Sequence, residues 1–319
     1  MDNTEDQNPE NNKLDQQHHD NGLEERREDA VTPYDPYEQD ASQMSFLDHL
    51  EELRWHLIRS LGAIMVFAIA AFLLKDFVWG VLLLGPTKPD FWTFQMFCKV
   101  SSAIGSDAFC FDEMPFIIQS RKMTGQFSMH IVSSAVIGLI VAFPYAFWEI
   151  WRFVSPGLYE NERKLSRGAV FFVSLLFMLG VLFGYFVVTP ISVNFLGNYQ
   201  VDPTIMNEFD ITSYISIVVT LVLACGLLFQ LPIVVYFLSK AGVISPEILV
   251  KYRKHAIVVI LIIAALVTPP DPITQLLVTF PLLLLYQASI YISKMVVRKE
   301  ARKEAMKEAE DAAQDSTKD

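Results

Sequence analysis

Charged residues are scarce in this chain of 319 residues, at 19%, against 52% hydrophobic residues and a mean hydropathy of +0.32. This balance excludes a soluble domain with a single core and indicates a polytopic membrane protein. Catalytic motifs are missing too: there is no His-Glu-x-x-His, no Gly-x-Ser-x-Gly and no phosphate-binding glycine loop. We therefore expect no enzyme, and neither a metal, a cofactor nor a nucleic acid as ligand.

Cysteine is also rare, with three residues in the whole chain. Cys98 and Cys110 lie in one long connection, at about residues 80–125. An oxidising compartment on that side of the membrane would allow a disulfide between them, with two free thiols as the alternative. Cys225 lies within an apolar segment, where a small packing residue is the simplest interpretation.

The net charge of -11 belongs almost wholly to residues 1–43, which hold about 13 acidic and 3 basic side chains. This segment has almost no large aliphatic residues, so it cannot bury enough apolar surface to offset the entropy of ordering. We predict a disordered acidic tail. It lacks the basic start and apolar run of a secretory signal peptide.

Six apolar segments follow the tail, at about 57–79, 126–153, 169–190, 213–239, 255–268 and 273–293. The first four are long enough for a hydrocarbon core of about 30 Å, whereas the last two are short. Phe46, Leu50, Leu53 and Leu57 form one helical stripe before the first segment, which predicts a short amphipathic helix on the membrane face. The predicted fold is an all-α polytopic membrane protein with six transmembrane helices at 44–295 and a charged tail at 296–319.

Lysine and arginine predict the orientation. They gather in the loops after the second and fourth segments and in the C-terminal tail, whereas the connection 191–212 has none. Positive charge favours the inner side, so we predict a multi-pass protein of the cytoplasmic (inner) membrane with both termini in the cytoplasm.

Four polar residues fall in or beside the apolar segments. Glu149 is expected to reach the headgroups at a membrane face. Gln230, two residues before Pro232, is expected to hydrogen-bond across helices. Asp271 and Gln275 lie at the last outer hairpin, where a turn-forming aspartate is the simplest interpretation. The alternative for all four is an intramembrane polar or partner-docking role.

His49, Glu52 and His56 fall on one side of the predicted amphipathic helix. Their spacing permits a metal site, but two histidines and one glutamate without a further ligand are a weak signal. We expect a solvated polar face instead.

Several stretches together resemble one family, TatC, the receptor subunit of the twin-arginine protein translocase. The resemblance covers roughly residues 44–295 and rests on His49-Leu-Glu-Glu-Leu-Arg54, Phe153-Val-Ser-Pro-Gly-Leu-Tyr-Glu-Asn-Glu-Arg163, Phe186-Val-Val-Thr-Pro190 and Leu266-Val-Thr-Pro-Pro-Asp271.

The resemblance implies a receptor that binds Arg-Arg signal peptides of folded export substrates at the cytoplasmic face. It also implies assembly with single-span TatA or TatB-type subunits, self-association within the membrane lipid, and transport driven by the proton-motive force. The family's arginine-recognising glutamates fall on Glu52 and Glu162, with Arg54, Phe153 and Arg163 in the same motifs.

One departure concerns Gln230, because many family members have a glutamate there. This predicts a structural or partner-docking role for Gln230 rather than proton coupling. A small-solute or proton-coupled transporter remains an alternative, as does a membrane scaffold. A transporter would need a polar site at mid-membrane, and the segments show no pair of Gly-interrupted helices and few carboxylates. Signal-peptide binding separates the three.

Overall fold

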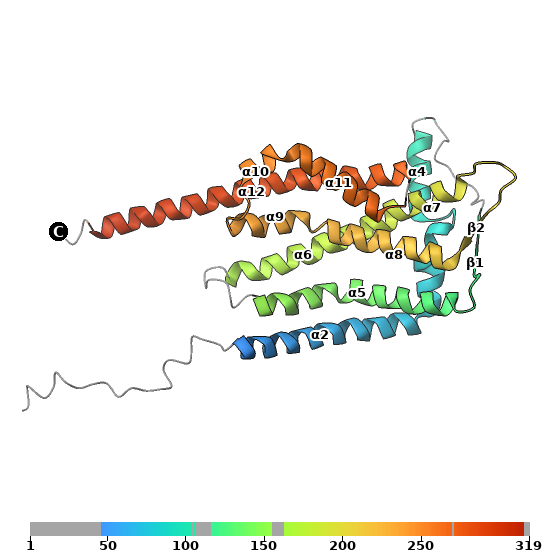
Figure 1. Cartoon of the computed structure of the whole chain (residues 1–319), viewed down its shortest axis with the longest axis horizontal. Coiled ribbons are helices and arrows are strands. Elements are labelled where there is room, and N and C mark those ends of the chain that lie inside the picture. Colours follow the sequence, from blue (N-terminus) through green and yellow to red (C-terminus); the bar gives the residue numbers. More distant parts are fainter. Residues whose placement is uncertain (1–45, 104, 106–115, 155–162, 270, 316–319) are drawn as a thin grey trace, which may run out of the picture. The chain divides into compact units, whose positions relative to one another are not determined.

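The computed structural model describes residues 46–103, 105, 116–154, 163–269 and 271–315. The chain divides into two units, Met1–Leu53 and Arg54–Asp319. The described part of the first unit is the beginning of one helix, and the acidic tail predicted to be disordered lies outside the described residues. The second unit is an assembly of long helices, which confirms the predicted all-α membrane fold (Figure 1).

The first helix, α2 (Phe46–Leu73), is 28 residues long and continuous. The sequence predicted a short amphipathic helix followed by a separate span, and the structure joins the two. Neither proline nor glycine occurs between Phe46 and Leu61, so nothing stops the helix at the membrane face. After Leu73 the chain turns through α3 (Lys75–Phe77), a π-turn η1 (Val78–Leu83) and η2 (Gly85–Thr87) into α4 (Trp92–Ala103).

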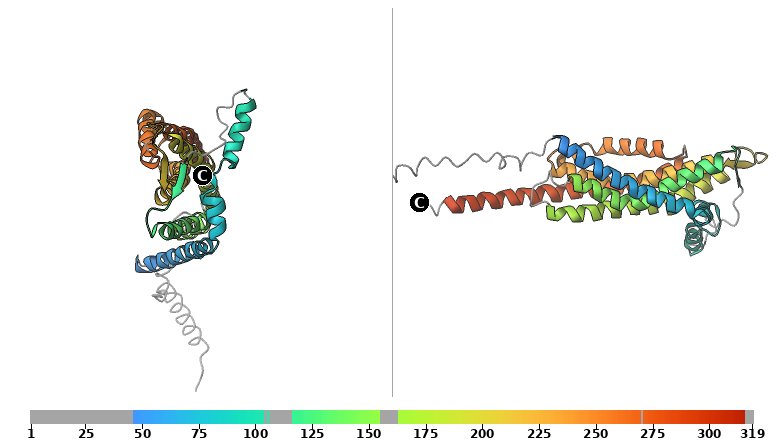
Figure 2. Two further views of the ribbon diagram at one scale, coloured as in Figure 1. Left: turned by 90° about the vertical axis from the view of Figure 1, so that its right-hand side faces the viewer. Right: turned by 90° about the horizontal axis from the view of Figure 1, so that it is seen from below.

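The remaining helices pack along one another in the second unit (Figures 1 and 2). They are α5 (Gly125–Val154), α6 (Arg163–Phe183), π-turn η5 (Gly184–Val188), α7 (Thr189–Asn198), α8 (Ile211–Leu228), α9 (Leu231–Lys240), α10 (Pro246–Lys251), α11 (Arg253–Val267) and α12 (Pro272–Asp315). Helix α7 continues the direction of α6, and α9 continues that of α8 (Figures 1 and 2).

Five helical segments of the described chain are long and apolar enough to cross a membrane: Glu51–Leu73, Gly125–Phe153, Val170–Asn198, Ile211–Lys240 and Pro272–Ala309. The fifth predicted segment is α11, which is short as expected, with 15 residues. A count of six spans therefore stays a prediction.

The expectation of a short sixth helix is wrong. Helix α12 has 44 residues and continues through the charged tail beyond its neighbours α9 and α11 (Figure 2). No proline or glycine follows Pro281, so the alanine-, lysine- and glutamate-rich tail continues the helix that the membrane segment begins.

Two membrane segments depart from a regular α-helix, each just before a proline. The third passes through the π-turn Gly184–Val188 just before Pro190. The fourth breaks between α8 and α9, just before Pro232. Proline has no backbone N–H to donate, so the regular helical hydrogen-bond pattern changes next to both residues.

Helix α8 lies at the centre of the packing. A Cβ added to Gly180 of α6 would meet the carbonyl oxygen of Cys225 at 2.5 Å, so the two backbones touch only because this position is glycine. Phe177, one turn earlier, is buried in the first apolar cluster. A second cluster joins α8 to α11 and α12 around Leu221 and Leu282. Cys225 is buried and is a free thiol, as expected of a packing residue.

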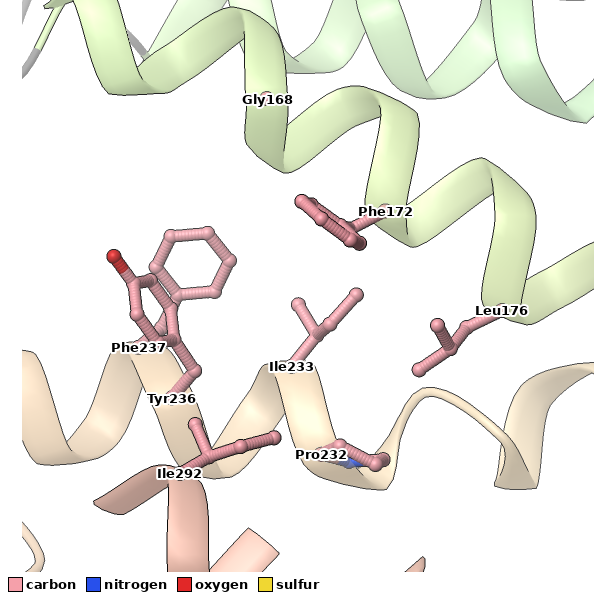
Figure 3. Close-up of a pocket in the computed structure, with 8 residues that line it drawn as sticks. All are labelled: Gly168, Phe172, Leu176, Pro232, Ile233, Tyr236, Phe237 and Ile292. Carbon is pink, nitrogen blue, oxygen red and sulfur yellow. The ribbon is translucent and has the colours of Figure 1, made fainter. Parts of the chain in front are cut away.

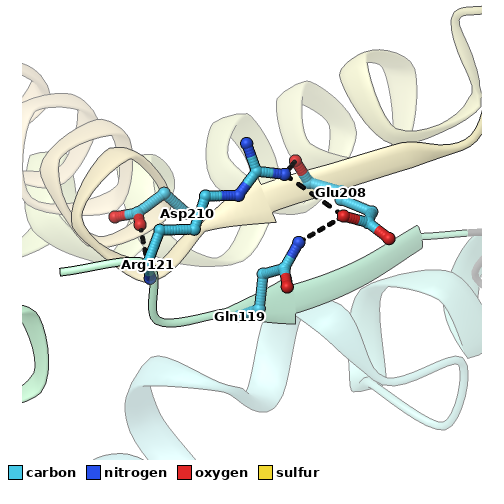
Figure 4. Close-up of polar contacts among 4 residues, drawn as sticks. All are labelled: Gln119, Arg121, Glu208 and Asp210. Atoms are coloured by element: carbon cyan, nitrogen blue, oxygen red, sulfur yellow. Dashed lines mark hydrogen bonds and ion pairs between the residues drawn. The ribbon is translucent and has the colours of Figure 1, made fainter.

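Beyond the helices lies a two-stranded parallel sheet that the sequence did not predict. β1 (Phe116–Gln119) pairs with β2 (Asn207–Asp210) in the register Phe116 to Asn207. A guanidinium nitrogen of Arg121 lies 3.2 Å from the carboxylate of Glu208, to which Gln119 also donates (Figure 4). The pair ties the connection before α5 to the connection before α8.

Asp210 at the end of β2 also caps α8. It accepts from the backbone N–H of Thr212 at 2.8 Å and from that of Arg121 at 3.0 Å. These donors, with the Thr212 hydroxyl contributing most, lower the pKa of Asp210 to about 2.

Candidate functional site

A buried polar pair joins α2 to α5. The carboxylate of Glu149 is 2.5 Å from Nδ1 of His56, and both side chains are almost wholly buried. Arg152, one turn further on, lies 3.7 Å from the other carboxylate oxygen and is half exposed. A hydrogen bond to a buried carboxylate is strong, so it holds the Glu149 side chain in place inside the protein. The expectation that Glu149 reaches the headgroups is therefore wrong. Its burial within the apolar helix α5 fits the alternative, an intramembrane polar residue, whereas a partner-docking role stays a prediction.

The expectation of a solvated face for His56 is wrong as well. His56 turns toward α5, and its ring centroid lies 6.4 Å from that of Phe153 at the end of α5. Sequence reasoning missed the pair because its members are 93 residues apart. A glutamate inside an apolar helix was the available signal, since such a group requires a partner.

One residue of the second motif segment, Phe153, lies near this pair. Phe153, half-buried, is the last residue but one of α5. Glu162 lies outside the described residues, and Arg163 begins α6. The recognition role of these residues stays a prediction.

The other end of the motif pair lies at the beginning of α2. Glu52, in the first unit, is partly buried, and Arg54 is exposed. The guanidinium of Arg54 lies 5.6 Å from the centre of the Trp55 ring, a cation–π distance that orients its head along the helix surface.

Gln230 makes the hydrogen bond across helices that the sequence predicted. Its side-chain amide donates to the carbonyl of Val173 in α6 at 3.3 Å. In a regular helix the backbone N–H of Gln230 would donate to the carbonyl of Gly226, but here it donates to that of Leu227. The side-chain amide of Gln230 donates to the Gly226 carbonyl instead, at 3.4 Å. Gln230 thus fastens the break between α8 and α9 to α6. Its partner-docking role stays a prediction.

Asp271 and Gln275 stabilise the turn between α11 and α12. Asp271 is buried, and its Oδ1 accepts from the backbone N–H of Thr274 at 2.6 Å, which caps α12. Gln275 donates to the carbonyl of Leu261 in α11 at 3.4 Å. The turn-forming interpretation therefore describes Asp271, and neither residue lies beside the His56–Glu149 pair.

Cys98 lies in α4, whereas Cys110 is outside the described residues, so their pairing stays a prediction. Within the described residues no group of three or more His, Cys, Asp or Glu side chains is arranged to hold a metal ion.

Comparison with known proteins gives consistent matches. The family model for the Sec-independent protein translocase protein (TatC) matches residues 48–281. The chain is 40% identical over 261 residues to the Sec-independent protein translocase protein TatC of Blattabacterium sp. subsp. Periplaneta americana (strain BPLAN), covering 81% of this chain and 98% of that protein. It is 33% identical over 258 residues to the TatCy protein of Bacillus subtilis (strain 168), covering 81% and 92%.

Solved structures agree with the sequence matches. The crystal structure of a twin arginine translocase receptor, TatC, aligns with a TM-score of 0.59 and 34% sequence identity. The alignment covers 78% of this chain and 99% of that one.

Proposed function

Because this chain belongs to the TatC family of Sec-independent protein translocase proteins, we propose that it is the signal-peptide receptor of a twin-arginine translocase. It binds the Arg-Arg signals of folded proteins at the cytoplasmic face of the inner membrane, with both of its termini in the cytoplasm. The lysines and arginines of the inner loops and the C-terminal tail support this orientation.

Recognition falls to Glu52 and Glu162. A carboxylate accepts both N–H groups on one side of an arginine fork, and lysine cannot copy that geometry. Each charge-assisted hydrogen bond contributes about 1.5–3 kcal/mol, so two of them separate Arg-Arg from Lys-Lys signals by more than tenfold. Arg54, Phe153 and Arg163 shape the same site.

The observation that carries this proposal is the His56–Glu149 pair. Glu52 and His56 are four residues apart on one helix and therefore share a face. His56 in turn is hydrogen-bonded to Glu149 of α5, five residues before that helix ends at Val154. Such an anchor supports convergence of the two motif segments, which are about 100 residues apart, on one membrane face.

The exposed apolar surface of the helices supports association with lipid and with other membrane subunits. Helix α2 exposes large hydrophobic residues along much of its length, among them Leu57, Leu61, Met65 and Ile69. In a membrane these side chains face lipid, single-span TatA or TatB-type subunits, or a second copy of the chain. Transport by such an assembly draws on the proton-motive force. The short α11 favours a locally thinned bilayer, which is easier to perturb during transport.

The test is binding of a synthetic Arg-Arg signal peptide and its Lys-Lys variant to the purified protein in detergent. We expect the wild type to prefer Arg-Arg by more than tenfold, and Glu52→Gln and Glu162→Gln each to lose most of that preference. Glu304→Gln, an exposed glutamate of α12, is the matched control and keeps it. If both site variants fold and keep the preference, the recognition site is elsewhere.

A further inference from the structure

Two cavities adjoin along α9, and they differ in chemistry. The larger of the two, of about 320 Å³, has an almost purely apolar lining between α6, α9 and α12. Phe172 and Leu176 project from α6 toward Ile233 and Tyr236 of α9 (Figure 3). We refer to it as the apolar cavity.

The second cavity, of about 260 Å³, lies between α9 and α12 and is lined by Lys240, Lys299 and Lys303. Glu300 is the one carboxylate in its lining and lies 3.2 Å from Lys303. Three positive charges against one negative charge leave a net charge of +2. We refer to it as the lysine cavity. It shares Tyr236 and Ile292 with the apolar cavity, so the two are continuous in lining.

The helices hold this arrangement in place. The hydroxyls of Ser239 in α9 and Ser293 in α12 are hydrogen-bonded at 2.7 Å and buried, immediately beside the cavities. Lys299 and Lys303 are four residues apart on α12 and share the face toward α9. The apolar run of α12 ends at Val297, so the lysine cavity is level with the membrane–water interface and the apolar cavity with the acyl chains.

We propose that the two cavities together bind one anionic phospholipid. Its phosphate lies among the three lysines and one acyl chain lies along Phe172, Ile233 and Leu176. The charge complementarity is that of a basic pocket at the cytoplasmic side of transmembrane helices. The linings of the two cavities share no residue with the proposed signal-peptide site.

Native mass spectrometry of the delipidated protein tests this, with phosphatidylglycerol and phosphatidylcholine of identical acyl chains. We expect the first bound phosphatidylglycerol to bind about tenfold more tightly than phosphatidylcholine. In the triple variant Lys240→Gln/Lys299→Gln/Lys303→Gln the two lipids bind alike. The matched control Lys251→Gln/Lys254→Gln/Lys307→Gln removes three lysines outside both cavity linings and keeps the preference.

Two further measurements distinguish the contribution of the apolar cavity from that of the lysine cavity. Ile292→Trp fills the shared lining, so it weakens both lipids while leaving the charges intact. The soluble headgroup glycerophosphoglycerol lacks acyl chains and competes poorly at equal concentration. The proposal is overturned if the wild-type protein binds phosphatidylglycerol no more tightly than phosphatidylcholine, or if the control triple variant loses as much of this preference as the cavity triple variant. It is also overturned if glycerophosphoglycerol displaces bound phosphatidylglycerol as well as the intact lipid does.

Discussion

The His56–Glu149 pair gives the sharpest prediction about stability. Replacing His56 by alanine leaves the Glu149 carboxylate, 2% exposed, with Arg152 at 3.7 Å as the nearest basic group of the described chain. Breaking a buried pair typically costs about 3–5 kcal/mol, because the remaining charge loses its partner away from water. The hydrogen bond from Tyr145 to Glu149 and the charge of Arg152 compensate in part, so we expect about 2–4 kcal/mol.

That loss corresponds to a melting temperature lower by roughly 5–10 °C for the protein in detergent. Glu149→Gln keeps an acceptor for His56 and costs about 1 kcal/mol. The double variant His56→Leu/Glu149→Leu removes both polar groups. Its loss of stability should therefore be smaller, by at least about 1 kcal/mol, than the summed losses of the single variants His56→Leu and Glu149→Leu.

The control is the exposed pair of Arg121 and Glu208, whose side chains are 57% and 48% exposed. Arg121→Ala is expected to cost less than about 1 kcal/mol, since water screens exposed pairs. Equal shifts for His56→Ala and Arg121→Ala, or strictly additive effects of the two leucine changes, would refute the view that the buried pair anchors α5 to α2.

Two further predictions concern packing and pH. Gly180→Ala places a methyl group 2.5 Å from the Cys225 carbonyl oxygen, so we expect it to destabilise the protein by about 1–3 kcal/mol and to lower the melting temperature accordingly. The control is Gly62→Ala, where no atom lies within 4 Å of the added methyl group, and its melting temperature should be unchanged or slightly raised. A normal melting temperature for Gly180→Ala would contradict the close approach of α6 and α8. The pKa of Asp210 is lowered from 3.8 to about 2, so the stability that its carboxylate contributes is complete above about pH 4 and is lost as the pH falls toward 2. The difference in melting temperature between wild type and Asp210→Asn should therefore shrink between pH 5 and about pH 2.5, and a constant difference would show that Asp210 does not act through its charge.

Much of the site chemistry was readable from local sequence, for a physical reason. Gln230 had to bond across helices because an amide in an apolar segment beside Pro232 has no water to satisfy it, and the structure shows it bonded to Val173. Asp271 among prolines had to cap or turn, and it caps α12. These residues follow rules of a few neighbouring positions, so no knowledge of distant partners was needed.

Other features depended on distant partners and were missed. Glu149 looked like a residue at a membrane face because nothing within one helical turn marks His56 as its partner. The parallel pairing of β1 with β2 joins segments about 90 residues apart, and neither strand has a strong alternating pattern.

The amino-acid sequence alone was enough to predict a mostly helical membrane protein, the approximate positions of its apolar segments and the family motifs that it contains. Hydrophobicity and helical periodicity are local properties, and the bilayer requires every backbone hydrogen bond to be made within a helix. The tertiary structure was needed to show that a buried hydrogen-bonded pair holds α2 to α5, and that an apolar cavity between α6, α9 and α12 adjoins a cavity lined by three lysines. Both depend on which helix faces lie together, and that is set by packing between distant parts of the chain.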